Sequence, residues 1–170
     1  VSLILGAETD LSATTTLGLM AYIGDSTVTA PGSPSVDRTE LLVGPYFATT
    51  LGNGDLLSGY LTYGQPQYTI ANAVTTGESY TAALTWTGSV ERDGADLAPF
   101  VSVSARREMP NATDRIDATI LTIGSSINGD LVATDRGVRQ LFGRVEMDFG
   151  DYSDTLGTAI RYSAPRAGLG

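Results

Sequence analysis

Apolar side chains occupy every second position in several stretches of this chain. In the clearest stretch, ESYTAALTWTGSV, the large apolar side chains are Tyr80, Leu84, Trp86 and Val90, and small or hydroxyl residues stand between them. A period of two is typical of a β-strand with two unlike faces. The apolar face must meet either a protein core or the hydrocarbon of a membrane.

The same alternation predicts strands along the whole chain, and helical periodicity is nearly absent. The predicted strands cover roughly residues 1–7, 17–23, 39–50, 57–63, 80–90, 97–104, 116–127, 130–134, 141–149 and 155–163. The dipeptides Asp93-Gly94 and Asn128-Gly129 are typical of hairpin turns, because these residues tolerate positive φ. A hairpin at Asn128-Gly129 brings the expected number of strands to ten.

The predicted connections alternate in length. Three of them, residues 25–37, 65–77 and 107–115, are long and polar, whereas the connections near Asp10, Asn53, Asp93, Asn128 and Asp151 are short. Short turns on one rim and long loops on the other are typical of outer-membrane barrels. The sequence therefore predicts an all-β fold, an antiparallel up-and-down β-barrel of about 10–12 strands. A soluble β-sandwich or small barrel is the alternative.

The composition limits the classes of partner and of catalytic chemistry that are open to this chain. The 170 residues suffice for a single domain, 1–170, with its own core. A net charge of -9 argues against nucleic acid as a partner. All ten basic residues are arginine, and the chain has no Cys, His or Lys, so thiolate, imidazole and Schiff-base chemistry are excluded. We expect no enzyme, no cofactor and no metal site.

One acidic run deserves a separate hypothesis. In DFGDYSD, Asp148, Asp151 and Asp154 stand three residues apart. Calcium loops of the EF-hand type need ligands at alternate positions and a final glutamate, which this run lacks. A plain turn is the favoured interpretation.

Each face of the predicted sheet receives candidate residues. Tyr80, Leu84, Trp86 and Val90 are the lipid-facing candidates, and the eleven residues from Tyr80 to Val90 match the roughly 9–11 needed for a tilted strand to cross a membrane. Isolated charges inside predicted strands suit a wet lumen in which opposite charges pair. The candidates for lumen charges are Arg106, Arg144, Glu146 and Arg161.

Three segments resemble the autotransporter β-domain family. VGPYFATTLGNGDLLSGYLTYG at 43–64 is similar to its succession of a Tyr-bearing strand, a Gly-rich turn and a Gly/Tyr-bearing strand. GADLAPFVSVSARRE at 94–108 resembles its next hairpin, and VRQLFGRVEMDFG at 138–150 a later strand with a central glycine. The resemblance extends over most of residues 1–163.

This resemblance implies a twelve-stranded barrel that lies in the bacterial outer membrane. Such a barrel anchors a secreted protein and is the conduit for a passenger segment of the same chain. The partners it implies are the lipid bilayer and that passenger. The chain begins as if in mid-strand and ends APRAGLG rather than with the aromatic residue typical of the family, so we expect a fragment of a longer chain. The alternative function is a soluble extracellular binding or assembly domain.

Overall fold

The fold consists of long antiparallel strands joined by short connections. The computed structural model describes residues 2–28, 35–92, 95–111, 115–134, 137–155 and 159–169. Its eleven strand segments are β1 (Ser2–Asp10), β2 (Thr15–Val28), β3 (Val36–Thr50), β4 (Leu56–Gly64), β5 (Gln67–Ile70), β6 (Ala73–Thr87), β7 (Val90–Arg92), β8 (Ala95–Pro110), β9 (Ile116–Thr134), β10 (Gly137–Asp154) and β11 (Ala159–Leu169).

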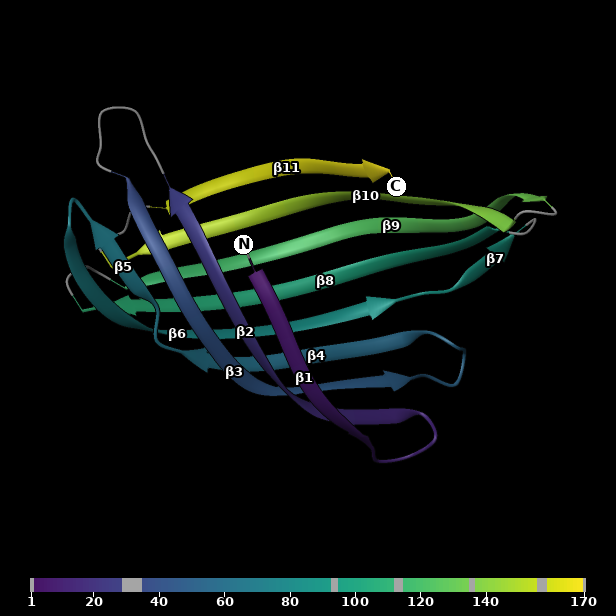
Figure 1. The fold of residues 1–170 in the computed structure, drawn as a ribbon, viewed down its shortest axis with the longest axis horizontal. Coiled ribbons are helices and arrows are strands. Elements are labelled where there is room, and N and C mark those ends of the chain that lie inside the picture. The colour runs from purple at the N-terminus through teal and green to yellow at the C-terminus, as the bar shows by residue number, and fades with distance from the viewer. Residues whose placement is uncertain are drawn as a thin grey trace.

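These strands form one sheet, in which each strand pairs with its neighbours in the sequence. The order along the sheet is β1-β2-β3-β4-β6-β8-β9-β10-β11, with every pairing antiparallel. The sheet curls so that β1 to β3 cross in front of β8 to β11 (Figure 1). The predicted all-β, antiparallel up-and-down barrel fold is confirmed.

Two pairs of segments are each one interrupted strand. β4 and β5 keep the same register against β3, since Leu42 lies opposite Gly64 and Thr39 opposite Gln67. β6 and β7 likewise keep one register against β8. Nine strand lengths therefore cross the described part of the sheet.

The hairpin predicted at Asn128-Gly129 is wrong. β9 runs without a break through both residues, with Asn128 opposite Phe142 and Gly129 opposite Leu141 on β10. The pairing partners on β8 and β10 hold this dipeptide extended, which overrides its local preference for a turn. Residues 130–134 continue β9 instead of forming a separate strand.

Two further predictions about connections are corrected by the same ladders. Residues 65–77 form most of a hairpin instead of a long loop, because β5 and the first part of β6 pair across a two-residue turn. That turn, Ala71-Asn72, has positive φ at both positions, as a type I′ turn requires. The turn predicted around Asp151 is also strand, since β10 continues to Asp154. The dipeptide Asp93-Gly94 lies outside the described residues.

The connections between strands lie on two rims of the sheet, which we call the short-turn rim and the extended rim. The short-turn rim carries residues 11–14 and 51–55 and the connections from Arg92 to Ala95 and from Thr134 to Gly137. The extended rim carries the connections from Val28 to Val36, Ile70 to Ala73, Pro110 to Ile116 and Asp154 to Ala159. Successive connections along the chain therefore lie on alternate rims, as an up-and-down sheet requires.

Candidate functional site

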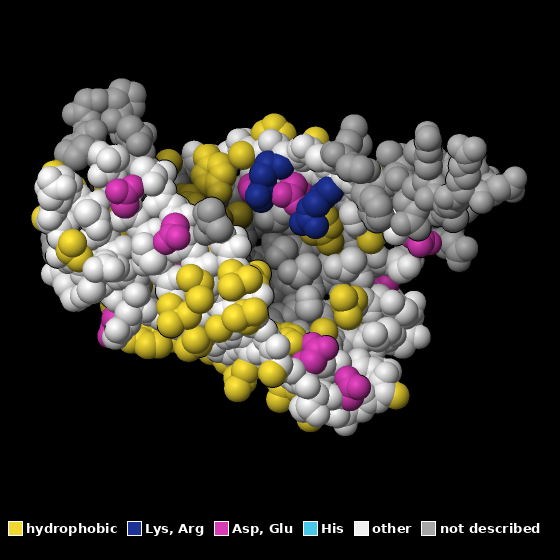
Figure 2. Space-filling view, viewed as in Figure 1, with side chains coloured by type: hydrophobic (Ala, Val, Ile, Leu, Met, Phe, Trp, Pro, Cys, Tyr) yellow, Lys and Arg dark blue, Asp and Glu magenta, His cyan; other side chains and the backbone are white. Residues whose placement is uncertain are grey.

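The outer face of the sheet carries a continuous set of exposed hydrophobic side chains, which we call the belt. Directly opposite residues share a face, so the registers show which side chains stand together. The belt consists of Leu3, Leu5, Leu17, Leu19, Ile23, Leu41, Val43, Leu61, Tyr63, Tyr80, Leu84, Trp86, Val90, Val101, Val103, Ile123, Val145, Met147 and Phe149, all exposed. Figure 2 shows hydrophobic side chains gathered over β1 to β3.

The belt has a clear boundary towards the extended rim. The next outward position after Ile23 is Asp25, after Tyr80 it is Glu78, and after Phe149 it is Asp151. Strands β5, β6 and β8 nevertheless continue beyond this boundary. Towards the short-turn rim the belt reaches almost to the turns. The sheet therefore projects further from the belt on its extended rim.

The four lipid-facing candidates all lie in the belt. Their exposed fractions are 40% for Tyr80, 50% for Leu84, 37% for Trp86 and 50% for Val90. The ring of Tyr80 lies 5.0 Å from that of Tyr63 at the extended-rim boundary. The Trp86 indole donates a hydrogen bond to Asp55 (3.1 Å) near the short-turn rim. The structure places these rings where interfacial aromatic residues stand in membrane barrels, and their contact with lipid stays a prediction.

The inner face inverts the usual distribution of buried residues. Among the described residues, the buried hydrophobic side chains are few: Leu42, Pro66, Tyr68, Phe100 and Ala118. The buried polar or charged ones are Glu40, Thr62, Ser79, Glu146 and Asp148. Buried carboxylates are uncommon in proteins unless they are paired. The interior of the curled sheet is therefore a polar space lined by ion pairs, with few apolar contacts to hold it together.

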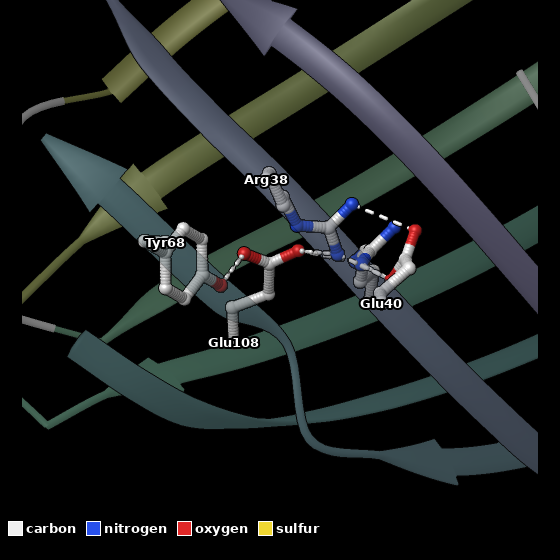
Figure 3. A network of polar contacts seen from close by, with 5 residues as sticks. Arg38, Glu40, Tyr68 and Glu108 are labelled. Atoms are coloured by element: carbon white, nitrogen blue, oxygen red, sulfur yellow. Dashed lines mark hydrogen bonds and ion pairs between the residues drawn. The ribbon is translucent and has the colours of Figure 1, made fainter. Parts of the chain in front are cut away.

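A network of four charged residues spans the inner face between β3 and β8. Glu40 accepts from Arg38 Nη1 (2.7 Å) and from Arg106 Nη2 (2.6 Å). Glu108 accepts from Arg38 Nη2 (2.9 Å) and from the Tyr68 hydroxyl (2.6 Å). Arg38, Tyr68 and Glu108 converge from three strands (Figure 3). Because β5 and β6 lie between β3 and β8 in the sheet, these contacts join distant strands over the concave surface.

A second group of charges lies on β10 and β11. Glu146 accepts from Arg144 Nε (2.6 Å) and is paired with Arg166 Nε (2.9 Å). The Arg144 guanidinium stands 4.2 Å from the ring centre of Phe100 on β8, a cation–π contact. Asp148 accepts from the Thr122 hydroxyl (2.7 Å). These two groups of inner-face charges lie at separate places, and each contains two arginines and two carboxylates.

The structure brings three of the four lumen candidates to the inner face and leaves one outside. Arg106 belongs to the network of Glu40 and Glu108, and Arg144 and Glu146 pair with each other. Arg161 lies opposite Asp151 on the outer face, 84% exposed, and its Nε contacts that carboxylate at 3.0 Å. The predicted strand over 155–163 begins only at Ala159, and its register turns Arg161 outward.

Sequence reasoning missed most of the β3–β8 network. Tyr68 and Glu108 lie in segments predicted as loops, 65–77 and 107–115, Arg38 lies between the predicted loop 25–37 and the predicted strand 39–50, and Glu40 lies inside that strand without having been chosen as a candidate. A signal was present, since Val36, Arg38, Glu40 and Leu42 alternate with outward residues and extend the strand. Following the alternation through charged positions would have extended this strand to Val36 and placed Arg38 and Glu40 on its inner face.

The acidic run 148–154 does not assemble a metal site. Asp148 points inward and Asp151 outward on the same strand, so their carboxylates lie on opposite faces. Across the residues that the structure describes, no three acidic side chains are grouped as metal ligands. In those same residues there is no helix long and apolar enough to span a bilayer.

Comparison with known proteins supports the fold. No protein-family model matches this sequence, and no curated protein does. Among solved structures, the chain is similar to the β domain of the Bordetella autotransporter BrkA, with a TM-score of 0.74 and 19% sequence identity. The similarity covers 99% of this chain and 83% of that one. The chain therefore has the fold of an autotransporter β domain, an outer-membrane β-barrel fold, as the sequence motifs predicted.

Proposed function

We propose that this domain is an outer-membrane β-barrel that anchors a passenger of its own chain and is the conduit for its secretion. The observation that carries the proposal is the inverted distribution of side chains. Leu84 and Val103 stand exposed on the outside, whereas Glu40 and Glu146 are buried on the inside. Soluble monomers rarely expose apolar patches of more than a few hundred Å². A bilayer covers such a belt, and water and paired charges suit the interior.

The orientation follows from the two rims. Outer-membrane barrels have short turns in the periplasm and longer structures outside the cell. The extended rim, with the projecting hairpin of β5 and β6, therefore faces the cell exterior in this proposal. Tyr63 and Tyr80 then lie at the outer interface and Trp86 towards the periplasmic one.

The passenger role is supported by the fold and by the chemistry of the inner face. The similar β domain belongs to a protein whose name calls it an autotransporter. The inner wall carries Ser and Thr hydroxyls and paired Arg and Glu side chains, which offer hydrogen bonds to a passing peptide. We assign no reaction to the domain, and the inner arginines Arg38, Arg106 and Arg144 form ion pairs with Glu40, Glu108 and Glu146.

Residues 1–170 belong, in this proposal, to a longer barrel-forming chain. Nine alternating strand lengths leave β1 and β11 running in the same direction at the two ends of the sheet. Bacterial outer-membrane barrels close with antiparallel neighbours and an even number of strands. An odd number of further strands, supplied by the same chain, would close this sheet in that manner.

Fluorescence of Trp86, the one tryptophan in the sequence, tests the membrane location. The full-length protein, with other tryptophans replaced, is refolded into vesicles whose lipids carry bromine on their acyl chains. We expect quenching of Trp86 and aggregation when detergent and lipid are both withheld. A monodisperse preparation in plain buffer with Trp86 unquenched would refute the proposal and favour a soluble β-domain.

The conduit role requires a separate measurement. In cells that express the full-length protein, external protease should remove the passenger while the barrel stays in the outer-membrane fraction. A barrel that inserts normally but leaves its passenger in the periplasm would retain the anchor role and refute the conduit.

A further inference from the structure

We infer that the outer face of β6, β8 and β9 binds a phosphate-bearing anionic lipid at the extended-rim boundary of the belt. The inference rests on the proposed membrane location and adds a specific ligand to it. Two observations combine at this place. A groove with an apolar floor lies inside the belt, and directly beside it two exposed arginine side chains share one carboxylate partner, Asp117.

The groove results from a row of small side chains. Ala82 on β6 lies opposite Ala105 on β8, which lies opposite Thr119 on β9. Leu61 stands at the end of this row on β4 and is 57% exposed. Larger side chains around the row leave a depression of about 610 Å³. Its small, exposed floor can receive the first methylene groups of an acyl chain without displacing any side chain.

The charged cluster follows one row further towards the extended rim. Arg107 lies opposite Tyr80 on one side and Asp117 on the other. Asp117 is paired with Arg107 Nε at 2.7 Å and with Arg115 Nε at 3.0 Å. The hydrogen bond from Arg107 is the main cause that lowers the pKa of the Asp117 carboxyl, which lies outside the belt. One ionised carboxylate thus faces two guanidinium groups.

The arrangement fits a phosphate better than a further protein carboxylate. Both arginines contact Asp117 through Nε, and their side chains are 53% and 47% exposed. Guanidinium groups bind phosphate oxygens through two parallel N–H donors. Tyr80, whose hydroxyl donates to Glu78 at 3.1 Å, places the cluster at the level where interfacial aromatic residues meet lipid headgroups.

Another outward arginine shows what distinguishes this cluster. Arg161 lies opposite Asp151 just outside the belt and is paired with it one to one, at 3.0 Å. It therefore offers no excess of positive charge. This makes Arg161 the matched control, with the same residue type, the same face and the same side of the belt.

Retention of phosphatidylglycerol by the full-length protein tests the inference. The protein is taken from detergent into vesicles of phosphatidylcholine with or without phosphatidylglycerol, and bound lipid is counted by native mass spectrometry. We expect wild type and Arg161→Gln to retain phosphatidylglycerol. The double variant Arg107→Gln/Arg115→Gln should need an about tenfold higher phosphatidylglycerol content for the same occupancy, as the loss of one charge-assisted contact implies.

A second variant tests the groove separately from the charges. Ala105→Leu fills the floor with a side chain that the belt already contains, so the barrel should fold while lipid retention falls about as much. Equal retention by all four proteins would overturn the inference while leaving the membrane location intact. Displacement by glycerol 3-phosphate at the same concentration as the lipid would also overturn it, because a site for free phosphate needs no acyl groove. Failure of the wild type to enter vesicles would refute the proposed function itself.

Discussion

Leu84 and Thr85 are neighbours in β6, yet Leu84 lies on the apolar outer face of the sheet and Thr85 on its polar inner face. Leu84 is half exposed and stands beside Val103 on the outer face. Thr85 points inward, where its hydroxyl lies 2.8 Å from that of Ser102. In a soluble sheet the apolar row would be covered and the hydroxyl row would face solvent. The comparison shows that this sheet exposes apolar side chains on its outer face and turns hydroxyl side chains inward, the reverse of a soluble sheet.

The largest expected effect is on the outer face. Leu84→Arg places a charge near the middle of the belt and should lower the free energy of unfolding by about 2 to 4 kcal/mol. Thr85→Arg should cost less than about 1 kcal/mol, because a wet lumen solvates the guanidinium. Urea unfolding of the full-length protein in vesicles measures both changes in the free energy of unfolding. The folded fraction is read from the gel mobility of unheated samples. Equal losses would show that the two faces are assigned wrongly.

On the inner face, the corresponding change is Glu40→Ala. It leaves the guanidinium groups of Arg38 and Arg106 to share Glu108, and removing a carboxylate from a buried ion pair is strongly destabilising. We expect a loss of about 2 to 3 kcal/mol in the same unfolding assay, less than for a pair with no second partner. An unchanged stability would mean that lumen water alone supports both arginines.

Gly44→Ala tests how closely the strands approach one another. A Cβ atom at Gly44 would stand 1.9 Å from the Leu61 carbonyl oxygen, so the backbone must move. We expect a loss of about 2 kcal/mol in the unfolding free energy. Gly52→Ala, with nothing within 4 Å of its Cβ position, is the control and should change little. A tolerated alanine at Gly44 would indicate a wider spacing of β3 and β4.

The smallest effect is expected for Arg161→Gln. Its ion pair with Asp151 is exposed, and exposed pairs contribute at most about 1 kcal/mol. Stability should therefore change by less than about 0.5 kcal/mol. A loss comparable to that of Glu40→Ala would show that Arg161 takes part in a buried contact, as its selection as a lumen charge implied.

The alternation of side chains predicted the faces well and the strand ends poorly. The period of two identified Leu84 and Trp86 as one row, because a strand fixes this period by its backbone geometry. The turn signal of the dipeptide Asn128-Gly129 was wrong, because pairing with β8 and β10 keeps these residues extended. Local preference is the weaker influence when hydrogen bonds are available on both sides.

Charge pairing was only partly predictable for a different reason. Arg144 and Glu146 are two residues apart on one strand, so their contact follows from the period. The contact of Arg38 with Glu108 joins residues on strands that are not neighbours, and it depends on the curvature of the sheet. The spacing of these two residues in the sequence does not predict that curvature. Arg161 shows the converse error, since its register opposite Asp151 places it on the outer face.

The consecutive order of strands also bears on how the domain folds. Each ladder joins segments that are adjacent in the chain, as between β9 and β10 or β2 and β3. Short loops cost little conformational entropy to close, and folds rich in local contacts form faster than those with distant pairings. We therefore expect the sheet to form hairpin by hairpin, with closure of the barrel as the slow, final event.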